Sequence, residues 1–227
     1  MGTPHDGVSV GRYPRKDLRH PHPTARVIGR ARWPRDVVVG ETSGVVPEIH
    51  AADEARGIAV LLHPHPHFGG NRFHPFVEGL FRRLPEIGVS AIRFDFSSAE
   101  FCTAGEEAVA AIDEGAARWP QLPLILAGYS FGAGIASGIG DERIAGWYLL
   151  APPSEMLSAS TIGNDPRPKA IVVPEFDQFS PPATIAQVVA GWERTTITTV
   201  PNADHFVGAV QPIVDSALRW FELITNR

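Results

Sequence analysis

Runs of apolar residues alternate along this chain with stretches in which apolar and polar residues repeat at helical spacing. Residues 58–62 form the first run and are apolar at every position, which favours a parallel strand buried on both faces. Comparable runs recur at residues 89–94, 122–127, 144–150, 170–173 and 196–200, and amphipathic stretches span residues 75–85, 104–119, 131–140, 182–192 and 207–225. This alternation predicts an α/β fold, a mostly parallel, doubly wound sheet with helices on both faces.

The length of the chain and the spacing of its runs predict a single domain. Its 227 residues fit one α/β domain. Residues 1–24 are rich in Pro, Gly, His and Arg and show neither the alternation of a strand nor the spacing of an amphipathic helix. We therefore expect a flexible N-terminal arm there and one domain over residues 25–227. Short extended pieces are expected at residues 25–28 and 36–39. Only residues 152–167 leave room for a small lid, so we expect no large cap domain.

Composition and charge narrow the classes of partner. A net charge of −5 and a pI near 6.0 argue against a dedicated nucleic-acid binder, which needs clustered cations. Cys102 is the only cysteine, which excludes an internal disulfide and a zinc site of several thiolates. No apolar run approaches the roughly 18–20 residues that span a bilayer. We therefore expect a soluble, cytoplasmic protein that acts on a small molecule.

A G-x-S-x-G motif follows the run at residues 122–127. Gly128, Ser130 and Gly132 lie between a predicted strand and the start of a helix of small residues, which is the context that this motif requires. Its glycines allow the close backbone approach of a sharp strand-to-helix turn. A helix N-terminus also favours the negative charge that develops during acyl transfer. The motif predicts Ser130 as a nucleophile, and the alternative is a Gly-Ser turn without chemistry.

A serine nucleophile needs a base and a group that orients the base. Asp177 and His205 each follow a late apolar run, so both are expected at the same edge of the sheet as Ser130, in the chain order expected for this kind of sheet. Asp204 and Glu175 are rival acids. Asp204 adjoins His205, which makes a bond to its ring geometrically awkward, and Glu175 is expected on the strand. Asp177 is therefore the predicted orienting acid, unless it merely caps a helix.

The loop after the first apolar run is rich in histidine. An oxyanion hole needs two N–H donors, one from the residue after the nucleophile, Phe131, and one from this loop. The prolines between the histidines lack an N–H, which leaves His63, His65 and His67, and His65 is best placed. With His74 these histidines could instead bind a metal. The interleaved prolines argue against a shared ligand face, so we expect neither metal nor cofactor.

Other polar residues support plainer interpretations. Asp95 is expected to accept hydrogen bonds from loop amides, and Cys102 to act as a small apolar residue. We expect a solvated helix face to be formed by Glu106, Glu107, Asp113 and Glu114.

Several short motifs occur together between residue 57 and the C-terminus. They are His63-Pro64-His65-Pro66 with Gly69-Gly70, Arg93-Phe94-Asp95-Phe96, Gly128-Tyr129-Ser130-Phe131-Gly132-Ala133, Ala151-Pro152-Pro153, Asp177 with Pro181-Pro182, and His205-Phe206. On these motifs the chain resembles α/β-hydrolase-fold serine hydrolases, and among them the small, cap-less bacterial enzymes related to dienelactone hydrolases. The resemblance implies Ser130, Asp177 and His205 as the catalytic triad.

The chain departs from that pattern in three places. Residues 97–100 read Ser-Ser-Ala-Glu where relatives usually show Arg-Gly, the glycine often found three positions before Asp177 is absent, and residues 202–204 replace a glycine-containing turn. These departures bear on substrate choice more than on the chemistry. We therefore expect a serine hydrolase that cleaves small carboxylic esters or thioesters through an acyl-enzyme on Ser130. The alternatives are an acyltransferase with the same triad and a non-catalytic binding or scaffold protein that retains the fold.

Overall fold

The computed structural model describes residues 46–226, which form a seven-stranded sheet with helices on both faces. The strand order is β1-β3-β2-β4-β5-β6-β7, and every pair is parallel except the antiparallel pair of β1 and β3. The strands are β1 (Glu48–His50), β2 (Gly57–Leu62), β3 (Val89–Arg93), β4 (Leu124–Tyr129), β5 (Ile144–Leu150), β6 (Lys169–Phe176) and β7 (Thr195–Asp204). The predicted arm at residues 1–24 and the extended pieces at 25–28 and 36–39 lie outside the described residues.

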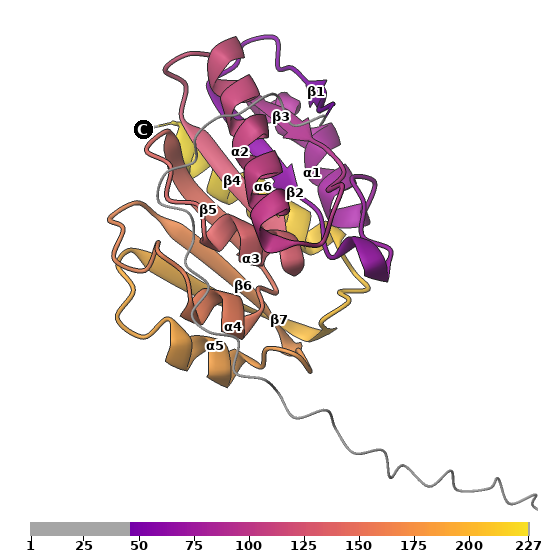
Figure 1. Cartoon of the computed structure of the whole chain (residues 1–227), viewed down its shortest axis with the longest axis vertical. Coiled ribbons are helices and arrows are strands. Elements are labelled where there is room, and N and C mark those ends of the chain that lie inside the picture. The colour runs from indigo at the N-terminus through magenta and orange to yellow at the C-terminus, as the bar shows by residue number, and fades with distance from the viewer. Residues whose placement is uncertain (1–45, 227) are drawn as a thin grey trace, which may run out of the picture. The chain divides into compact units, whose positions relative to one another are not determined.

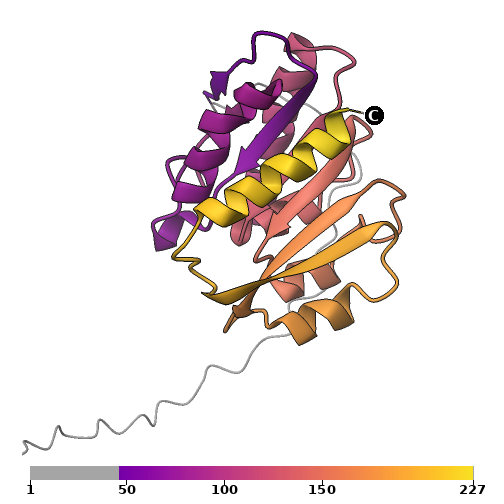
Figure 2. The same ribbon diagram turned by 180° about the vertical axis from the view of Figure 1, so that it is seen from behind.

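Helices cover the two faces of the sheet in separate groups. The helices are α1 (Pro75–Arg83), α2 (Phe101–Arg118), α3 (Phe131–Ser137), α4 (Ser154–Ser158), α5 (Pro182–Val188) and α6 (Gln211–Thr225), with short 3-10 turns at Pro66–Phe68 and Leu84–Ile87. Figure 1 looks onto the face covered by α2, α3, α4 and α5, and Figure 2 onto the face covered by α1 and α6. The α/β-hydrolase-like architecture predicted from the apolar runs is therefore present, and residues 46–226 contain no inserted cap domain.

The two faces build two hydrophobic cores, which explains why β2 is apolar at every position. Ile58, Val60 and Leu62 point into the core beneath α2, α3 and α5. Ala59 and Leu61 point into the core beneath α1 and α6. Because successive side chains of a strand alternate between faces, a strand covered on both faces needs apolar residues throughout.

One predicted strand is less buried than its sequence run suggests. The run at residues 196–200 forms the centre of β7, but β7 is the last strand of the sheet, and Ile197 is 40% exposed. The expectation of a strand buried on both faces is wrong here, because an edge strand has a neighbour on one side only and its threonines tolerate water. The short strand β1 and the one-turn helix α4 are additions that the apolar pattern did not predict.

The two ends of the parallel strands define two edges of the sheet. The carboxyl edge is where β2 to β6 end, and the amino edge is where they begin. Helix α6 returns to the amino edge, where the Arg56 side chain donates a hydrogen bond to Asn226 at 2.7 Å. None of the helices within residues 46–226 is both long and apolar enough to cross a membrane.

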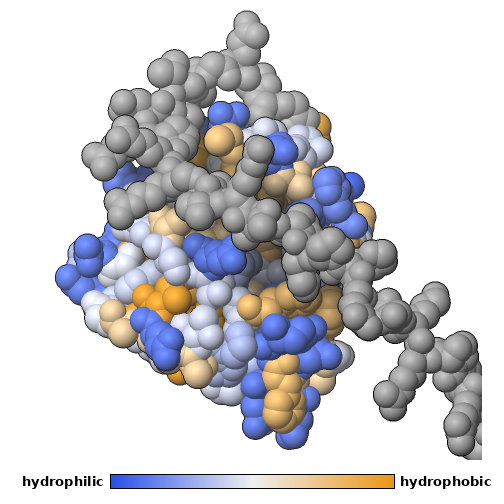
Figure 3. Space-filling view, turned by 60° about the horizontal axis from the view of Figure 1, so that its bottom comes forward, coloured by the Kyte–Doolittle hydropathy of each residue, from blue (hydrophilic) through white to orange (hydrophobic). Residues whose placement is uncertain are grey.

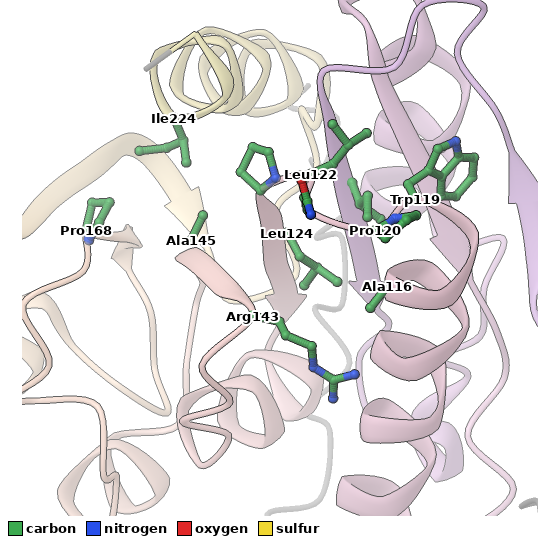
Figure 4. A pocket seen from close by; sticks show the side chains of 12 residues that line it. Ala116, Trp119, Pro120, Leu122, Leu124, Arg143, Ala145, Pro168 and Ile224 are labelled. Atoms are coloured by element: carbon green, nitrogen blue, oxygen red, sulfur yellow. The ribbon is translucent and has the colours of Figure 1, made fainter.

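A hollow of about 640 Å³ opens at the amino edge. Figure 4 shows apolar side chains from the end of α2, from β4 and from α6 around it, among them Trp119, Leu124 and Ile224. The Arg143 guanidinium at its rim pairs with Asp141 and Asp113 at 2.6 and 2.7 Å. The predicted catalytic residues belong to the opposite edge, so this hollow is separate from the candidate site.

Candidate active site

Ser130 occupies a sharp turn between β4 and α3. Its φ is +52° and its ψ is −114°, a conformation that costs a non-glycine residue on the order of 1–3 kcal/mol. Its amide donates to the Leu150 carbonyl at 2.9 Å, which ties the turn to the end of β5. A Cβ at Gly128 would lie 2.4 Å from the Gly132 backbone, and one at Gly132 would lie 2.4 Å from the Leu62 carbonyl oxygen. The two glycines of the motif are therefore required by close backbone contact, as predicted.

Three side chains meet at the carboxyl edge. Ser130 Oγ lies 2.9 Å from His205 Nε2, and His205 Nδ1 lies 2.8 Å from Asp177 Oδ2. Asp177 is 2% exposed and His205 is 8% exposed, so both are shielded by protein while Ser130 is half-buried. The structure thus brings together the serine, histidine and aspartate that the sequence singled out.

The rival acids are engaged elsewhere. Asp204 Oδ1 accepts the Phe206 amide at 3.0 Å, and Glu175 Oε2 accepts the Asn202 amide at 2.8 Å. Asp177 uses its second oxygen, Oδ1, to accept two backbone amides, from Phe179 at 2.9 Å and Ser180 at 2.8 Å. These two amides hold the carboxylate so that Oδ2 faces the imidazole.

The loop that carries His205 is anchored by Tyr129, the residue that precedes Ser130. The Tyr129 hydroxyl donates to the His205 carbonyl, and the His205 amide donates to the Gln178 side chain at 3.3 Å. Burial, together with the charges of Asp177 and Asp204, raises the pKa of Tyr129. The phenol therefore stays protonated and remains a donor. The sequence motif gives no signal for this bond, because G-x-S-x-G specifies no residue type at that position.

The two residues predicted to supply the oxyanion donors are in contact through their side chains. The imidazole of His65 and the ring of Phe131 are 5.0 Å apart between centroids. In the part of the chain that the structure describes, the amides of His65 and Phe131 donate to no protein acceptor, whereas the His67 amide donates to His65 Nδ1 at 3.2 Å. Between these two histidines, the geometry favours His65 as the loop donor.

The histidine-rich loop is held by hydrogen bonds rather than grouped around a metal position. Both ring nitrogens of His63 have partners, since Nδ1 bonds to the Pro64 carbonyl at 2.6 Å and Nε2 accepts the Phe96 amide at 2.9 Å. Nδ1 of His74 accepts the Phe76 amide at the start of α1. Burial lowers the pKa of His63, and burial together with the charge of His63 lowers the pKa of His74 to about 4. Within residues 46–226 no group of three or more His, Cys, Asp or Glu side chains is arranged to hold a metal ion.

The loop that follows β3 forms a wall beside Phe131. The Phe96 ring lies 5.4 Å from that of Phe131, and Ser97 donates from both its amide and its hydroxyl to Glu107. Glu107 is 3% exposed, so the expectation that it belongs to a solvated helix face is wrong. The signal was present in the sequence, because Glu107 stands three residues after Ala104 and four before Ala111, on the apolar stripe of α2.

Two plainer expectations for the same region can also be compared with the structure. Asp95 Oδ1 accepts the Arg72 amide at 2.7 Å, which confirms the prediction that it binds a loop amide. Cys102, in the first turn of α2, is exposed rather than packed in the core.

The chain matches no family model and no curated protein. It is similar to the crystal structure of a protein of unknown function from Agrobacterium tumefaciens that has been proposed to be an α/β hydrolase, with a TM-score of 0.73 and 25% identity over 82% of this chain and 94% of that one. The chain has the α/β-hydrolase fold.

Two further solved structures match this fold. A serine hydrolase without a lid from Xanthomonas campestris matches with a TM-score of 0.69 and 19% identity, over 80% of this chain and 89% of that one. Dienelactone hydrolase from Anabaena variabilis matches with a TM-score of 0.67 and 17% identity, over 79% of this chain and 92% of that one. The resemblance inferred from the sequence motifs is thereby confirmed for the fold, including its lid-less form.

Proposed function

We propose that this protein is a serine hydrolase that cleaves small carboxylic esters or thioesters. The observation that carries the proposal is the continuous chain of hydrogen bonds at the carboxyl edge, 2.9 Å from Ser130 Oγ to His205 Nε2 and 2.8 Å from His205 Nδ1 to Asp177 Oδ2. The Ser130 turn, from which that chain starts, is strained and tightly packed. Such strain persists where the surrounding structure imposes it, and it is common at active sites.

The hydrogen bonds favour one tautomer of the neutral imidazole. The Asp177 carboxylate can only accept, so His205 carries its proton on Nδ1 and leaves Nε2 free to accept the proton of Ser130. Ser130 Oγ then attacks the carbonyl carbon, and Nε2 takes the hydroxyl proton. The imidazolium is stabilised by Asp177. The amides of Phe131 and His65 donate to the oxygen of the tetrahedral intermediate.

The intermediate collapses when the bond to the leaving group breaks. The imidazolium of His205 gives its proton to the departing alcohol or thiol, and an acyl ester remains on Ser130. Water then enters, loses a proton to Nε2 and attacks the acyl carbon through a second tetrahedral intermediate. Its collapse returns the proton to Ser130 Oγ and releases the carboxylic acid, so the cycle consumes one ester and one water.

Substrate size follows from the absence of a cap in residues 46–226. Without an inserted domain over the carboxyl edge, the described part of the chain has little surface with which to enclose a long acyl group. This favours small esters and thioesters. An acyltransferase would use the same covalent intermediate with another acceptor. Product analysis with an added alcohol or thiol separates the two outcomes, because a hydrolase forms the carboxylic acid and an acyltransferase forms the new ester or thioester.

Labelling with a fluorophosphonate tests the proposal directly, because the reagent reacts only with an activated serine. We expect stoichiometric phosphonylation of the peptide that carries Ser130, read by mass spectrometry, and none in the Ser130→Ala variant. Ser158→Ala is the matched control, since Ser158 is an exposed serine at the end of helix α4 whose hydroxyl donates to the Ser154 carbonyl. A folded wild-type protein that neither takes the label nor hydrolyses p-nitrophenyl acetate would show a non-catalytic use of the fold.

A further inference from the structure

Large apolar side chains are exposed on both sides of the candidate site. Phe68, Phe101, Phe179 and Phe206 have 85%, 47%, 63% and 64% of their surface exposed. Figure 3 shows, on the face that it brings forward, that apolar side chains reach the surface in separate patches between polar ones. Burial of a phenylalanine is favourable by roughly 1.5–3 kcal/mol, so exposed phenylalanines beside reactive groups point to a ligand that covers them.

Phe179 and Phe206 form the wall on the side of the histidine. The Phe179 ring lies 4.8 Å from the His205 imidazole in an edge-to-face arrangement, and the Phe206 ring lies 5.8 Å from it. The two phenylalanine rings are 6.2 Å apart. We call this pair the histidine wall.

A second pair of exposed phenylalanines, Phe68 and Phe101, contacts the side chains of the two residues that carry the oxyanion amides. The Phe101 ring stacks on that of Phe131 at 5.9 Å, and the Phe68 ring lies 5.0 Å from the His65 imidazole. Phe131 and His65 carry the two amides that the mechanism assigns to the oxyanion. We call Phe68 and Phe101 the elbow wall.

The proposed mechanism places a different part of the substrate against each wall. His205 must return a proton to the leaving-group oxygen, so the leaving group lies on the side of the histidine wall. The carbonyl oxygen faces the amides of Phe131 and His65. The acyl substituent takes the remaining direction, away from His205, where the elbow wall begins.

The charges next to these walls disfavour anionic substrates. Glu100 precedes Phe101 and Asp204 precedes His205, and both residues are exposed. Each would repel a substrate carboxylate at short range. A neutral, apolar ester meets no such penalty.

We propose that the two walls select neutral esters with an apolar acyl group and an aromatic leaving group, the elbow wall holding the acyl group and the histidine wall the leaving group. This inference rests on the proposed function. It assigns Phe101 and Phe179 as specificity-determining residues on opposite sides of the scissile bond.

Two substrate pairs test the assignment. p-Nitrophenyl acetate and p-nitrophenyl hexanoate share a leaving group and differ in the acyl chain, whereas methyl acetate and 2-naphthyl acetate share the acyl group and differ in the leaving group. In Phe101→Ala we expect the hexanoate-to-acetate ratio of kcat/KM to fall about tenfold and the naphthyl-to-methyl ratio to change less than about twofold. In Phe179→Ala we expect the opposite pattern.

Ratios are measured because loss of a ring next to Phe131 or His205 can slow all substrates alike. Phe73→Ala is the matched control, since Phe73 is an exposed phenylalanine whose ring lies 4.9 Å from the Arg93 guanidinium and 5.0 Å from that of Arg72. Both ratios should stay at the wild-type value in this variant. The mono-p-nitrophenyl ester of adipic acid adds a carboxylate to the six-carbon chain, and we expect it to be hydrolysed at least about tenfold more slowly than the hexanoate.

The outcomes separate the inference from the proposed function. If Ser130 takes the fluorophosphonate but Phe101→Ala and Phe179→Ala change both ratios equally, the two-wall assignment is wrong and the hydrolase proposal stands. Faster cleavage of the adipate ester than of the hexanoate also overturns the inference. If Ser130 takes no label and none of the esters is cleaved, the proposed function fails and the inference fails with it.

Discussion

The contacts of Asp177 make the effect of replacing it by asparagine calculable. Oδ1 accepts the amides of Phe179 and Ser180, and Oδ2 faces His205 Nδ1 at 2.8 Å. In Asp177→Asn the amide oxygen is drawn to the two backbone donors, so the NH2 group faces the imidazole. His205 must then carry its proton on Nε2, where it cannot accept the proton of Ser130.

The cost of the opposite orientation sets the size of the effect. Turning the amide would leave two N–H groups without an acceptor, at about 1–3 kcal/mol each, or about 2–6 kcal/mol together. At about 1.4 kcal/mol per tenfold, only one molecule in about 30 to 2 × 10⁴ would hold the productive tautomer. We therefore expect kcat for p-nitrophenyl acetate to fall by a factor within this range, whose upper end, on the order of 10⁴, is close to the loss known for this substitution in a Ser-His-Asp triad.

The assay compares Asp177→Asn with Asp204→Asn at pH 7.5, after circular dichroism has shown that both fold. Asp204 bonds to the Phe206 amide and not to the imidazole, so its variant should keep activity within about threefold of wild type. A loss below tenfold in Asp177→Asn, or a larger loss in Asp204→Asn, would refute the assignment of the orienting acid.

Three further predictions concern the histidine-rich loop after β2 and the loop that carries His205. His65→Ala should keep most of the activity, whereas His65→Pro should lose on the order of 10²–10³ in kcat, because proline alone removes the backbone donor. Equal losses in the two variants, or inactivation by a chelator, would favour the metal alternative. Tyr129→Phe should lower kcat about tenfold with little change in KM, since the hydroxyl anchors the His205 carbonyl and does not face substrate; a change in KM alone would contradict this. Burial lowers the pKa of His63 and lowers that of His74 to about 4. Below pH 6.5 the unfolded chain therefore takes up protons that the folded protein does not. The free energy of unfolding, measured with urea, should fall by about 1.4 kcal/mol per pH unit per proton between pH 6.5 and 4.

His74→Asn is the control for the last of these predictions. Asparagine can accept the Phe76 amide at the start of α1 as His74 Nδ1 does, but it does not titrate. Its stability curve should lose about one proton of slope in the same pH range. An unchanged slope would show that His74 does not remain neutral in the folded protein.

The sequence was most informative where backbone geometry restricts residue type. A serine between two glycines at the end of an apolar strand predicted the turn at Ser130, and topology then brought Asp177 and His205 to the same edge. This works because parallel strands with right-handed crossovers all end on one side of the sheet. Local pattern and global topology agree at these positions.

Contacts between distant segments with no pattern of their own could not be predicted. The bond from Tyr129 to the His205 carbonyl joins residues that are 76 positions apart, and any residue type satisfies the motif at that position. Ser97 bonds to the buried Glu107 carboxylate only because α2 packs Glu107 against the loop after β3. The exposure of β7 depends on its being the last strand of the sheet, which the apolar run alone does not reveal.

The position of Asn226 has a practical consequence for handling the protein. Its bond to Arg56 holds the end of α6 at the amino edge, across the sheet from Ser130. A chemical anchor or affinity surface attached after this residue would leave the carboxyl edge facing the solution. An immobilised preparation coupled in this way, in a flow reactor or a biosensor, should therefore retain its access to dissolved esters.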